Sequence, residues 1–295
     1  MMWKVAAFYK FTALENLSDW QAKIKAECAK YGVCGTILLA PEGINSTCAA
    51  KPEDLDAFIT WLGTHKEFDG WELKFSAASE QPFKRMKVRL KKEIVTIRNE
   101  MADPTKIVGT YVSPAEWNKI IADPETILID TRNDYEVEIG TFKNAIDPKT
   151  DSFHEFPRWV KEHLDPAKHK KVAMFCTGGI RCEKASSYMK AEGFEEVYHL
   201  KGGILQYLED VPAEQSLWDG ECFVFDERVA VGHGLKEGNY TMCYGCGAFI
   251  TKETLEHKDY EPGIHCPKCK GTHSEEKLRS MRDQHKHYAK IKKSA

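Results

Sequence analysis

The chain has 295 residues, 42% of them hydrophobic, and carries a formal net charge of −3 at pH 7. This length and composition predict two or three domains with packed cores, and the near-neutral charge excludes a protein that holds nucleic acid by its overall charge alone. No apolar run approaches the roughly 18 residues of a membrane span, and the first residues lack the apolar stretch of a signal peptide. We therefore expect a cytoplasmic protein with no membrane partner.

Residues 1–100 carry the pattern of a small α+β domain, with elements in the order β-α-β-β-α-β. The first three strands are predicted by short apolar runs at 5–11, 34–40 and 44–49, and the runs at 71–75 and 86–97 together supply the closing strands. Helices are predicted where a capping box or a first-turn proline precedes an apolar stripe, starting at Ser18 and Pro52. This order is typical of a ferredoxin-like, or acylphosphatase-like, sandwich.

A second α/β pattern follows. Residues 101–122 are interpreted as a linker and the first helix of the next domain, because Asp103-Pro104 interrupts the preceding pattern. Residues 123–215 then predict a domain built on a parallel sheet. Its buried strands are expected at 126–129, 172–175 and 197–200. Polar motifs follow the first two of these strands, and in open α/β sheets functional sites lie at the carboxyl ends of the strands.

One of these motifs is Cys176-Thr177-Gly178-Gly179-Ile180-Arg181. A loop between a strand and a helix favours a thiolate, because free backbone N–H groups and the helix dipole supply partial positive charge. The two glycines let the backbone curl around an anion, and Arg181 adds a permanent positive charge. We therefore predict that Cys176 is a reactive thiol. A buried structural cysteine before an ordinary turn would not account for the glycines and the arginine.

The loop resembles the active-site loop of rhodanese sulfurtransferases, whose cysteine cycles through a persulfide. Asp130-Thr131-Arg132 resembles the segment that precedes it in that fold. The related phosphatases have five residues between cysteine and arginine, whereas four separate Cys176 from Arg181, which favours sulfur chemistry. The resemblance implies catalytic roles for Cys176, Arg181, Asp130 and Arg132. For the last two, a structural ion pair that positions the loop is an equal alternative.

Cys182, directly after the loop, has two interpretations. It either starts the following helix or resolves a persulfide as a disulfide with Cys176. The first is favoured, because nothing in the sequence places the two sulfur atoms together.

Residues 216–295 show a looser pattern that contains two Cys-x-x-Cys pairs and a basic, helical tail. Nineteen residues separate Cys243-x-x-Cys246 from Cys266-x-x-Cys269. Four thiolates at this spacing suit one tetrahedral Zn²⁺ in a closed structural site; free cysteines or redox pairs are the alternative. The remaining cysteines are expected to be small apolar residues of packed elements, namely Cys28, Cys34, Cys48 and Cys222.

A basic strand is the other unusual feature. Arg85, Lys87 and Arg89 alternate with apolar residues, so their side chains share one face of the predicted strand. Such a row suits a phosphate backbone, but a solvated edge strand has the same pattern, and charge alone favours that interpretation. The basic tail, 277–293, is equally ambiguous.

Several segments together resemble the bacterial rhodanese-domain tRNA uridine hydroxylases over most of the chain. These segments are 8–10, 42–45, 85–89, 129–146, 175–185 and 223–229, with the paired cysteines. The resemblance implies an oxidoreductase that hydroxylates uridine 34 of tRNA to 5-hydroxyuridine, with O₂ as co-substrate and Cys176 as the persulfide position. It also implies the tRNA anticodon arm as partner, which would give the basic strand a role.

Two alternatives stay open. The first is a plain sulfurtransferase that moves sulfane sulfur to a small-molecule, protein or RNA acceptor; the loop supports it as well, and only the whole-chain resemblance separates the two. The second is a non-catalytic RNA-binding or scaffold protein, against which the intact loop argues. We recognise no flavin or nicotinamide site, and the sequence gives neither the electron donor nor the oligomeric state.

Overall fold

The computed structural model describes residues 2–294. The chain divides into two compact units. The first comprises the described residues up to 227 together with 231–237, and the second comprises 228–230 and the described residues from 238 on. The first unit contains both predicted sheets, and the second contains the paired cysteines. Among the described helices, none is both long and apolar enough to cross a membrane.

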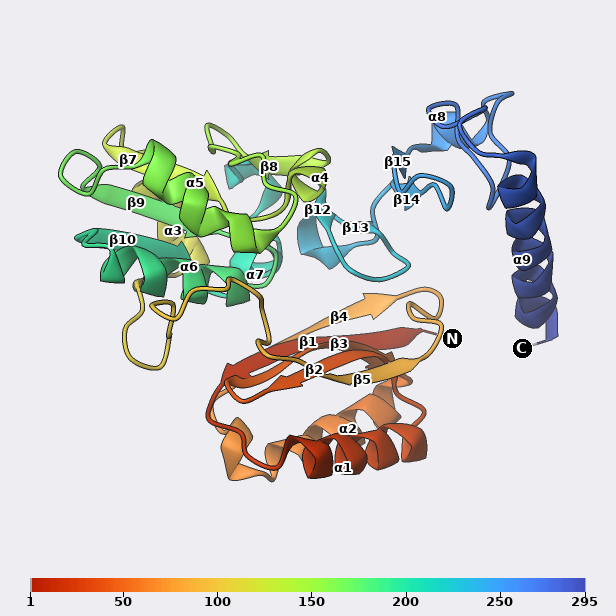
Figure 1. Ribbon diagram of the computed structural model, residues 1–295, viewed down its shortest axis with the longest axis horizontal. Helices are drawn as coiled ribbons and strands as arrows, with labels where there is room; N and C mark the ends of the chain where they lie inside the picture. Colours follow the sequence, from red (N-terminus) through yellow and green to blue (C-terminus); the bar gives the residue numbers. More distant parts are fainter. Residues whose placement is uncertain (1, 295) are drawn as a thin grey trace. The chain divides into compact units, whose positions relative to one another are not determined.

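The N-terminal domain is a five-stranded sheet with two helices on one face (Figure 1). Its strands are β1 (Trp3–Phe11), β2 (Cys34–Ala40), β3 (Gly43–Ala50), β4 (Glu72–Ala78) and β5 (Met86–Leu90). Its helices are α1 (Leu17–Lys30) and α2 (Pro52–Gly63), followed by the 3-10 turn η1 (Lys66–Phe68). The strand order is β4-β1-β3-β2-β5, antiparallel except that β5 runs parallel to β2. The predicted ferredoxin-like sandwich is confirmed.

Alternation along β1 explains why only one face of this sheet carries the helices. Ala6 and Phe8 point into the core formed with Ile24 of α1 and Phe58 of α2. Because successive side chains of a strand point to opposite faces, Tyr9 lies on the face without helices. That face becomes important for the functional site.

Two boundaries differ from those expected. The strand predicted at 86–97 ends at Leu90, because the N–H of Ile94 donates to Glu42 Oε1 at 2.6 Å and the N–H of Ile97 to Glu93 Oε2 at 3.0 Å. Carboxylates thus replace a neighbouring strand as acceptors. The first helix begins at Leu17 rather than after Ser18, behind an Asn16 with φ of 50°.

The second domain of this unit has the predicted parallel sheet, in the order β6-β10-β9-β7. Its strands are β6 (Thr110–Val112), β7 (Thr126–Asp130), β9 (Lys171–Phe175) and β10 (Glu196–Leu200). A separate antiparallel pair is formed by β8 (Gly140–Phe142) and β11 (Trp218–Gly220). Its helices are α3 (Pro114–Ile121), α4 (Asp134–Val137), α5 (Phe156–His163), α6 (Ile180–Ala191) and α7 (Gly203–Asp210), with 3-10 turns η2 (Phe153–Glu155) and η3 (Ala213–Gln215). Strand β6, with three residues, was not predicted.

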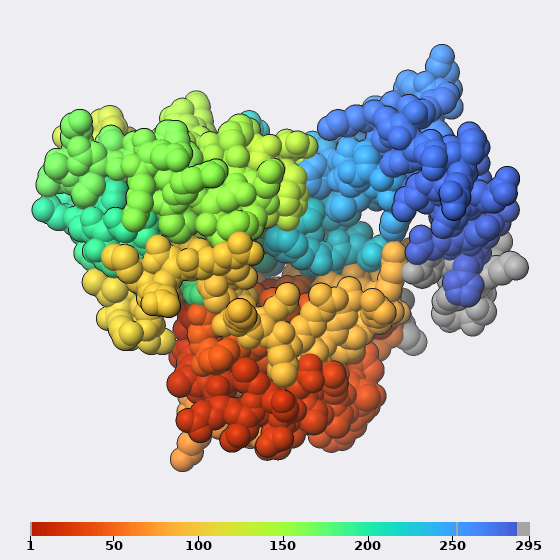
Figure 2. Space-filling view, in the orientation of Figure 1, coloured from red at the N-terminus to blue at the C-terminus, as the bar shows by residue number. Residues whose placement is uncertain are grey.

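The segment that links the two sheets is packed rather than free. Ile97 and Ala102 belong to a core cluster with Phe156 and Met174 of the second domain. In Figure 2 this segment, coloured orange to yellow, lies against both the red N-terminal domain and the green second domain. The linker is therefore part of the interior of the second domain.

The last part of the chain contributes to both units. Trp218, Cys222 and Leu235 pack in the core of the parallel-sheet domain, so the cysteine module begins later than the predicted residue 216. The remaining elements are β12 (Cys222–Phe223), β13 (Ala230–Val231), η4 (His233–Leu235), β14 (Thr241–Met242), β15 (Phe249–Ile250), α8 (Lys252–Leu255) and α9 (Glu275–Ser294). Strands β14 and β15 form an antiparallel pair beside the paired cysteines.

Candidate functional site

The two polar motifs meet at the carboxyl edge of the parallel sheet, as their positions after strands predict. Asp130 at the end of β7 lies opposite Phe175 at the end of β9. The backbone N–H and the hydroxyl of Thr131 both donate to the Phe175 carbonyl oxygen at 3.0 Å. Cys176 leaves the sheet at this point and is fully buried.

Glycines shape the loop around the Cys176 sulfur. Gly179, the residue before α6, has φ of 97°, a conformation that L side chains rarely adopt. Its N–H donates to Cys176 Sγ at 3.1 Å. On the other side, a Cβ at Gly203 would lie 2.5 Å from the Cys176 carbonyl oxygen, and the N–H of Ile204 donates to that oxygen at 2.9 Å. The start of α7 thus holds the backbone of the loop in place.

Arg181 reaches the loop as half of a buried ion pair. Its two terminal nitrogens donate to the carboxylate of Glu136 at 2.6 and 2.8 Å, and one also donates to Thr177 Oγ1 at 3.3 Å. Burial alone would raise the pKa of Glu136, but the charge and the hydrogen bonds of Arg181 hold it below its usual value. The pair is stable because each buried charge has its partner. It fixes a positive charge beside Cys176.

Glu136 is a site residue that the sequence analysis missed. The local signal for it was the capping box of α4, in which Glu136 also accepts the N–H of Asn133. That signal indicates a helix start and does not reveal that the same carboxylate binds an arginine 45 positions away.

Asp130 and Arg132 face each other. Arg132 Nη2 lies 2.6 Å from Asp130 Oδ2, and both side chains are fully buried. Arg132 also donates to the carbonyl oxygens of Glu136 and Gly140 at 3.1 and 2.5 Å, and Thr141 donates to Asp130 at 2.9 Å. This geometry favours the ion-pair alternative: the pair ties the end of β7 to α4 and β8.

The sulfur of Cys176 lies in a field that favours its anion. Burial raises the pKa of Cys176, but a hydrogen bond from Cys182, the charge of Arg181 and two backbone N–H groups outweigh it and lower the pKa to about 6. A free cysteine titrates near roughly 8.5. The loop therefore favours the thiolate of Cys176 more than the surroundings of an ordinary cysteine would.

Cys182 lies at the helix start, as favoured, and its sulfur also lies beside that of Cys176; its role in resolving a persulfide stays a prediction. It lies in the first turn of α6, and its thiol donates a hydrogen bond to the sulfur of Cys176. Burial and the neighbouring Cys176 raise the pKa of Cys182, and Thr131 Oγ1 lies 3.4 Å from its sulfur. Cys182 is thus a thiol beside a thiolate, a proximity that spacing along the chain did not reveal.

The lowered pKa of Cys176 predicts its alkylation profile. Because the thiolate is the reacting species, labelling of the Cys176 peptide by iodoacetamide is expected to rise with a midpoint near pH 6. Cys182→Ala should move the midpoint to higher pH by removing a hydrogen bond to the anion. Peptide mass spectrometry across pH measures both, and a midpoint near the ordinary value of about 8.5 would contradict the assignment.

The Asp130–Arg132 pair predicts a stability effect. Asp130→Asn leaves the Arg132 guanidinium buried without its counter-charge, so unfolding should require about 3–5 kcal/mol less free energy. Urea denaturation measures this. Asp219→Asn is the control, since Asp219 is exposed on β11 in the same domain and its loss should change stability by less than about 0.5 kcal/mol. Equal stability of both variants would refute the structural role.

In the second unit the four cysteines predicted as metal ligands come together. All four sulfur atoms lie within 4.8 Å of one another, with Cys243–Cys269 at 3.7 Å, Cys246–Cys266 at 3.8 Å and Cys266–Cys269 at 3.9 Å. A tetrahedral ion with metal–sulfur bonds of about 2.3 Å holds neighbouring sulfurs about 3.8 Å apart. The spacing of the thiols therefore fits a tetrahedral metal ion.

The turns that carry these cysteines also fit a metal site. The N–H of Gly247 donates to the Cys243 carbonyl oxygen at 2.8 Å, and that of Cys269 to the Cys266 carbonyl oxygen at 3.1 Å. A Cβ at Gly245 would lie 2.4 Å from the carbonyl oxygen of Ile264. Glycine is thus required where the two turns approach each other.

The predicted basic strand is the edge strand β5 with the residue before it. Arg85 and Arg89 are exposed, and Lys87 is half-buried. The structure places these residues at the sheet edge, and their role in RNA binding stays a prediction. Cys28, Cys34, Cys48 and Cys222 are buried, as expected for small apolar residues of packed elements.

Comparisons with known proteins agree with this architecture. Residues 3–94 match the UPF0176 acylphosphatase like domain, and residues 113–210 match the Rhodanese-like domain. Among solved structures, the rhodanese-like domain of an Anabaena protein aligns with 37% of this chain and 78% of its own, at 16% identity and a TM-score of 0.31. That likeness is too small to bear on function.

Two curated relatives match almost end to end. The tRNA uridine(34) hydroxylase of Rhizobium leguminosarum bv. trifolii is 56% identical over 282 residues, which cover 95% of this chain and 91% of the relative. That of Sinorhizobium fredii is 52% identical over 289 residues, covering 98% and 92%. At this identity and coverage, the chain belongs to the tRNA uridine(34) hydroxylase family.

Proposed function

We propose that this protein hydroxylates uridine 34 of tRNA to 5-hydroxyuridine and that Cys176 carries the reactive sulfur. The observation that carries the proposal is the match to the two hydroxylases at 52–56% identity over nearly the whole chain. The match extends through both sheet domains and the cysteine module. It therefore supports the hydroxylase over the sulfurtransferase alternative, which would need only the rhodanese-like domain.

The loop supports the choice of Cys176 as the residue that acts. The Gly179 N–H, the Cys182 thiol and the Arg181 charge stabilise negative charge on one sulfur atom. The same groups would stabilise a persulfide anion there, because it too carries its charge on sulfur. We propose that this persulfide, with O₂ as co-substrate and an external electron donor, serves the hydroxylation, and that the tRNA is held by its anticodon arm.

The proposal predicts the behaviour of cysteine variants in a strain that lacks its own tRNA uridine(34) hydroxylase. The wild-type chain should restore 5-hydroxyuridine in tRNA, as measured by nucleoside mass spectrometry, and Cys176→Ser should not. Cys222→Ala is the matched control, because Cys222 is also buried in this domain but burial raises its pKa to about 12. Restoration by Cys176→Ser would remove Cys176 from the mechanism, and loss of a thiolated nucleoside instead would favour the sulfurtransferase.

We further propose that the four-cysteine site holds a structural Zn²⁺. Four thiolate ligands fill a tetrahedral shell and leave no open position for chemistry. Protein purified without chelators should contain about one zinc per chain, and Cys266→Ser should release it and lower the stability of this module. Elemental analysis with thermal denaturation tests this, and substantially less than one equivalent in the wild-type chain would contradict it.

A further inference from the structure

The first turns of α6 present two buried charged residues that the thiol loop does not need. Glu183 is 7% exposed and Lys184 is 2% exposed. Charged side chains are almost never this buried without a specific partner. Each has at least one partner in the N-terminal domain or in the segment that follows it, a contact that the rhodanese-like domain alone does not supply.

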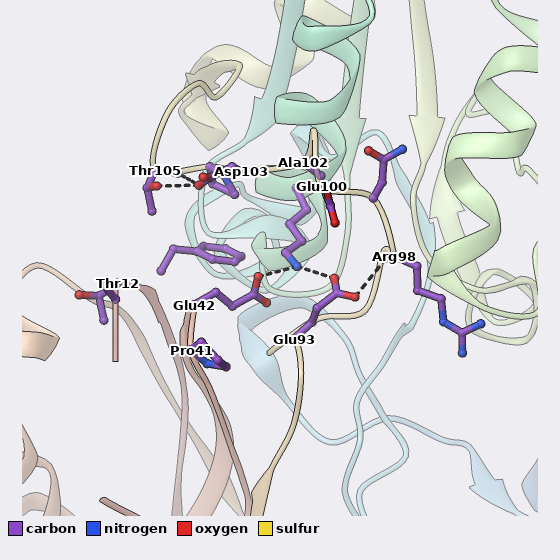
Figure 3. A pocket seen from close by; sticks show the side chains of 14 residues that line it. Thr12, Pro41, Glu42, Glu93, Arg98, Glu100, Ala102, Asp103 and Thr105 are labelled. Atoms are coloured by element: carbon purple, nitrogen blue, oxygen red, sulfur yellow. Dashed lines mark hydrogen bonds and ion pairs between the residues drawn. The ribbon is translucent and has the colours of Figure 1, made fainter. Parts of the chain in front are cut away.

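Lys184 forms two ion pairs that connect α6 to the N-terminal domain and to the segment after it. Its Nζ lies 2.7 Å from Glu42 Oε2, in the turn between β2 and β3, and 2.7 Å from Glu93 Oε2, beyond β5. Glu42 and Glu93 converge on this one ammonium group in the lining of a cavity of about 640 Å³ (Figure 3). The charged residues of its lining include more carboxylates than cations, which disfavours an RNA phosphate. Lys184 therefore serves to fix α6 against the N-terminal domain.

Glu183 differs, because its partners are hydroxyl groups. The hydroxyl of Tyr9 donates to Glu183 Oε1 at 2.7 Å, and the hydroxyl of Tyr111 is a second partner. Tyr9 comes from β1, on the sheet face without helices. A buried carboxylate is ordinarily paired with a cation. A carboxylate held only by two phenol hydroxyls lacks that compensating charge, so stability alone does not explain it.

The Tyr9–Glu183 pair lies against the thiol loop. A Cβ at Gly179 would be only 3.1 Å from the Tyr9 hydroxyl, and the N–H of the same Gly179 lies 3.1 Å from Cys176 Sγ. One residue thus contacts the sulfur on one side and the phenol on the other. The N-terminal domain consequently reaches the thiol loop through Tyr9.

We propose that Tyr9 and Glu183 are the proton-accepting pair of the hydroxylation, so that the N-terminal domain completes the active site. The proposal rests on the proposed function. Hydroxylation replaces the hydrogen on C5 of the uracil ring by a hydroxyl group. We place the pair in the last step, in which the sulfur nucleophile of Cys176 leaves C6 after oxygen has been added at C5.

In that step the C5–H bond breaks, and its electron pair forms the C5=C6 double bond. The C6–S bond also breaks, and its pair returns to the sulfur. The C5 proton passes to the Tyr9 hydroxyl, which gives its own proton to the Glu183 carboxylate. Charge and atoms balance without a further reactant, since one anion, the carboxylate, is neutralised and another, on sulfur, is formed.

The surroundings of Glu183 make its carboxylate a stronger base than an exposed glutamate. Burial raises the pKa of Glu183, the hydroxyls of Tyr9 and Tyr111 lower it in part, and the negative charges of Glu72 on β4 and of Cys176 raise it further. The net effect is a raised pKa. A proton acceptor works best when its pKa is near the working pH, which lies above that of an ordinary glutamate.

The test compares full-length Tyr9→Phe and Glu183→Gln with Tyr198→Phe. Tyr198 also donates to a glutamate, Glu196, at 2.8 Å in the same domain, but on β10. In the deficient strain, 5-hydroxyuridine should fall roughly 100-fold or more for the first two variants, the size expected for loss of acid–base catalysis. Tyr198→Phe should match the wild type.

A second readout separates proton transfer from support of the loop. Deuterium at C5 of uridine should lower the rate of 5-hydroxyuridine formation by a larger factor in Tyr9→Phe than in the wild type. The reason is that removal of the C5 proton becomes rate-limiting in the variant. Its Cys176 should still accept sulfur, as seen by peptide mass spectrometry. Wild-type levels of 5-hydroxyuridine in Tyr9→Phe would overturn the proposal, as would a matching loss of sulfur on Cys176. Failure of the proposed function itself would appear separately, as full activity of Cys176→Ser.

Discussion

The stabilisation of one buried sulfur anion is the constraint on which the rest of the site depends. Burial opposes charge on Cys176, and it is outweighed because the Cys182 thiol, the charge of Arg181 and the backbone N–H groups of both residues act on the same sulfur atom. The N–H of Gly179 donates to that sulfur as well. Arg181 is itself buried and needs Glu136 to hold it. Without these groups around it, the buried Cys176 thiol would stay protonated and unreactive at neutral pH.

The fold provides these groups through its topology. Parallel strands end at the same edge, so the residues that follow β7 and β9 meet although they are far apart along the chain. The Asp130–Arg132 pair ties the first of these ends to α4 and β8, and the start of α7 supports the second. The N-terminal sheet then adds Tyr9 from the face without helices, and the ion pair of Lys184 with Glu42 holds α6 against that domain.

Sequence patterns predicted the parts of this site that are local. The loop around Cys176, its position after a strand and the four-cysteine cluster all follow from spacing within short segments. The partners that lie far away in sequence were not predicted: Glu136 is 45 positions from Arg181, and Tyr9 is 174 from Glu183. Strand β6 is too short to show a period, and the strand expected to reach residue 97 stops at Leu90, where glutamate side chains replace a neighbouring strand as acceptors.

The central claim is that Cys176 carries the sulfur that serves hydroxylation. It is tested most directly by following Cys176 and its product in one reaction, with purified protein, tRNA that lacks 5-hydroxyuridine, a reductant and air. Mass spectrometry of the Cys176 peptide and of the tRNA nucleosides is then performed on the same samples. The account predicts 5-hydroxyuridine only from protein whose Cys176 carries an additional sulfur atom, in proportion to the fraction that does. Undiminished 5-hydroxyuridine from protein in which Cys176 has been fully alkylated would contradict it.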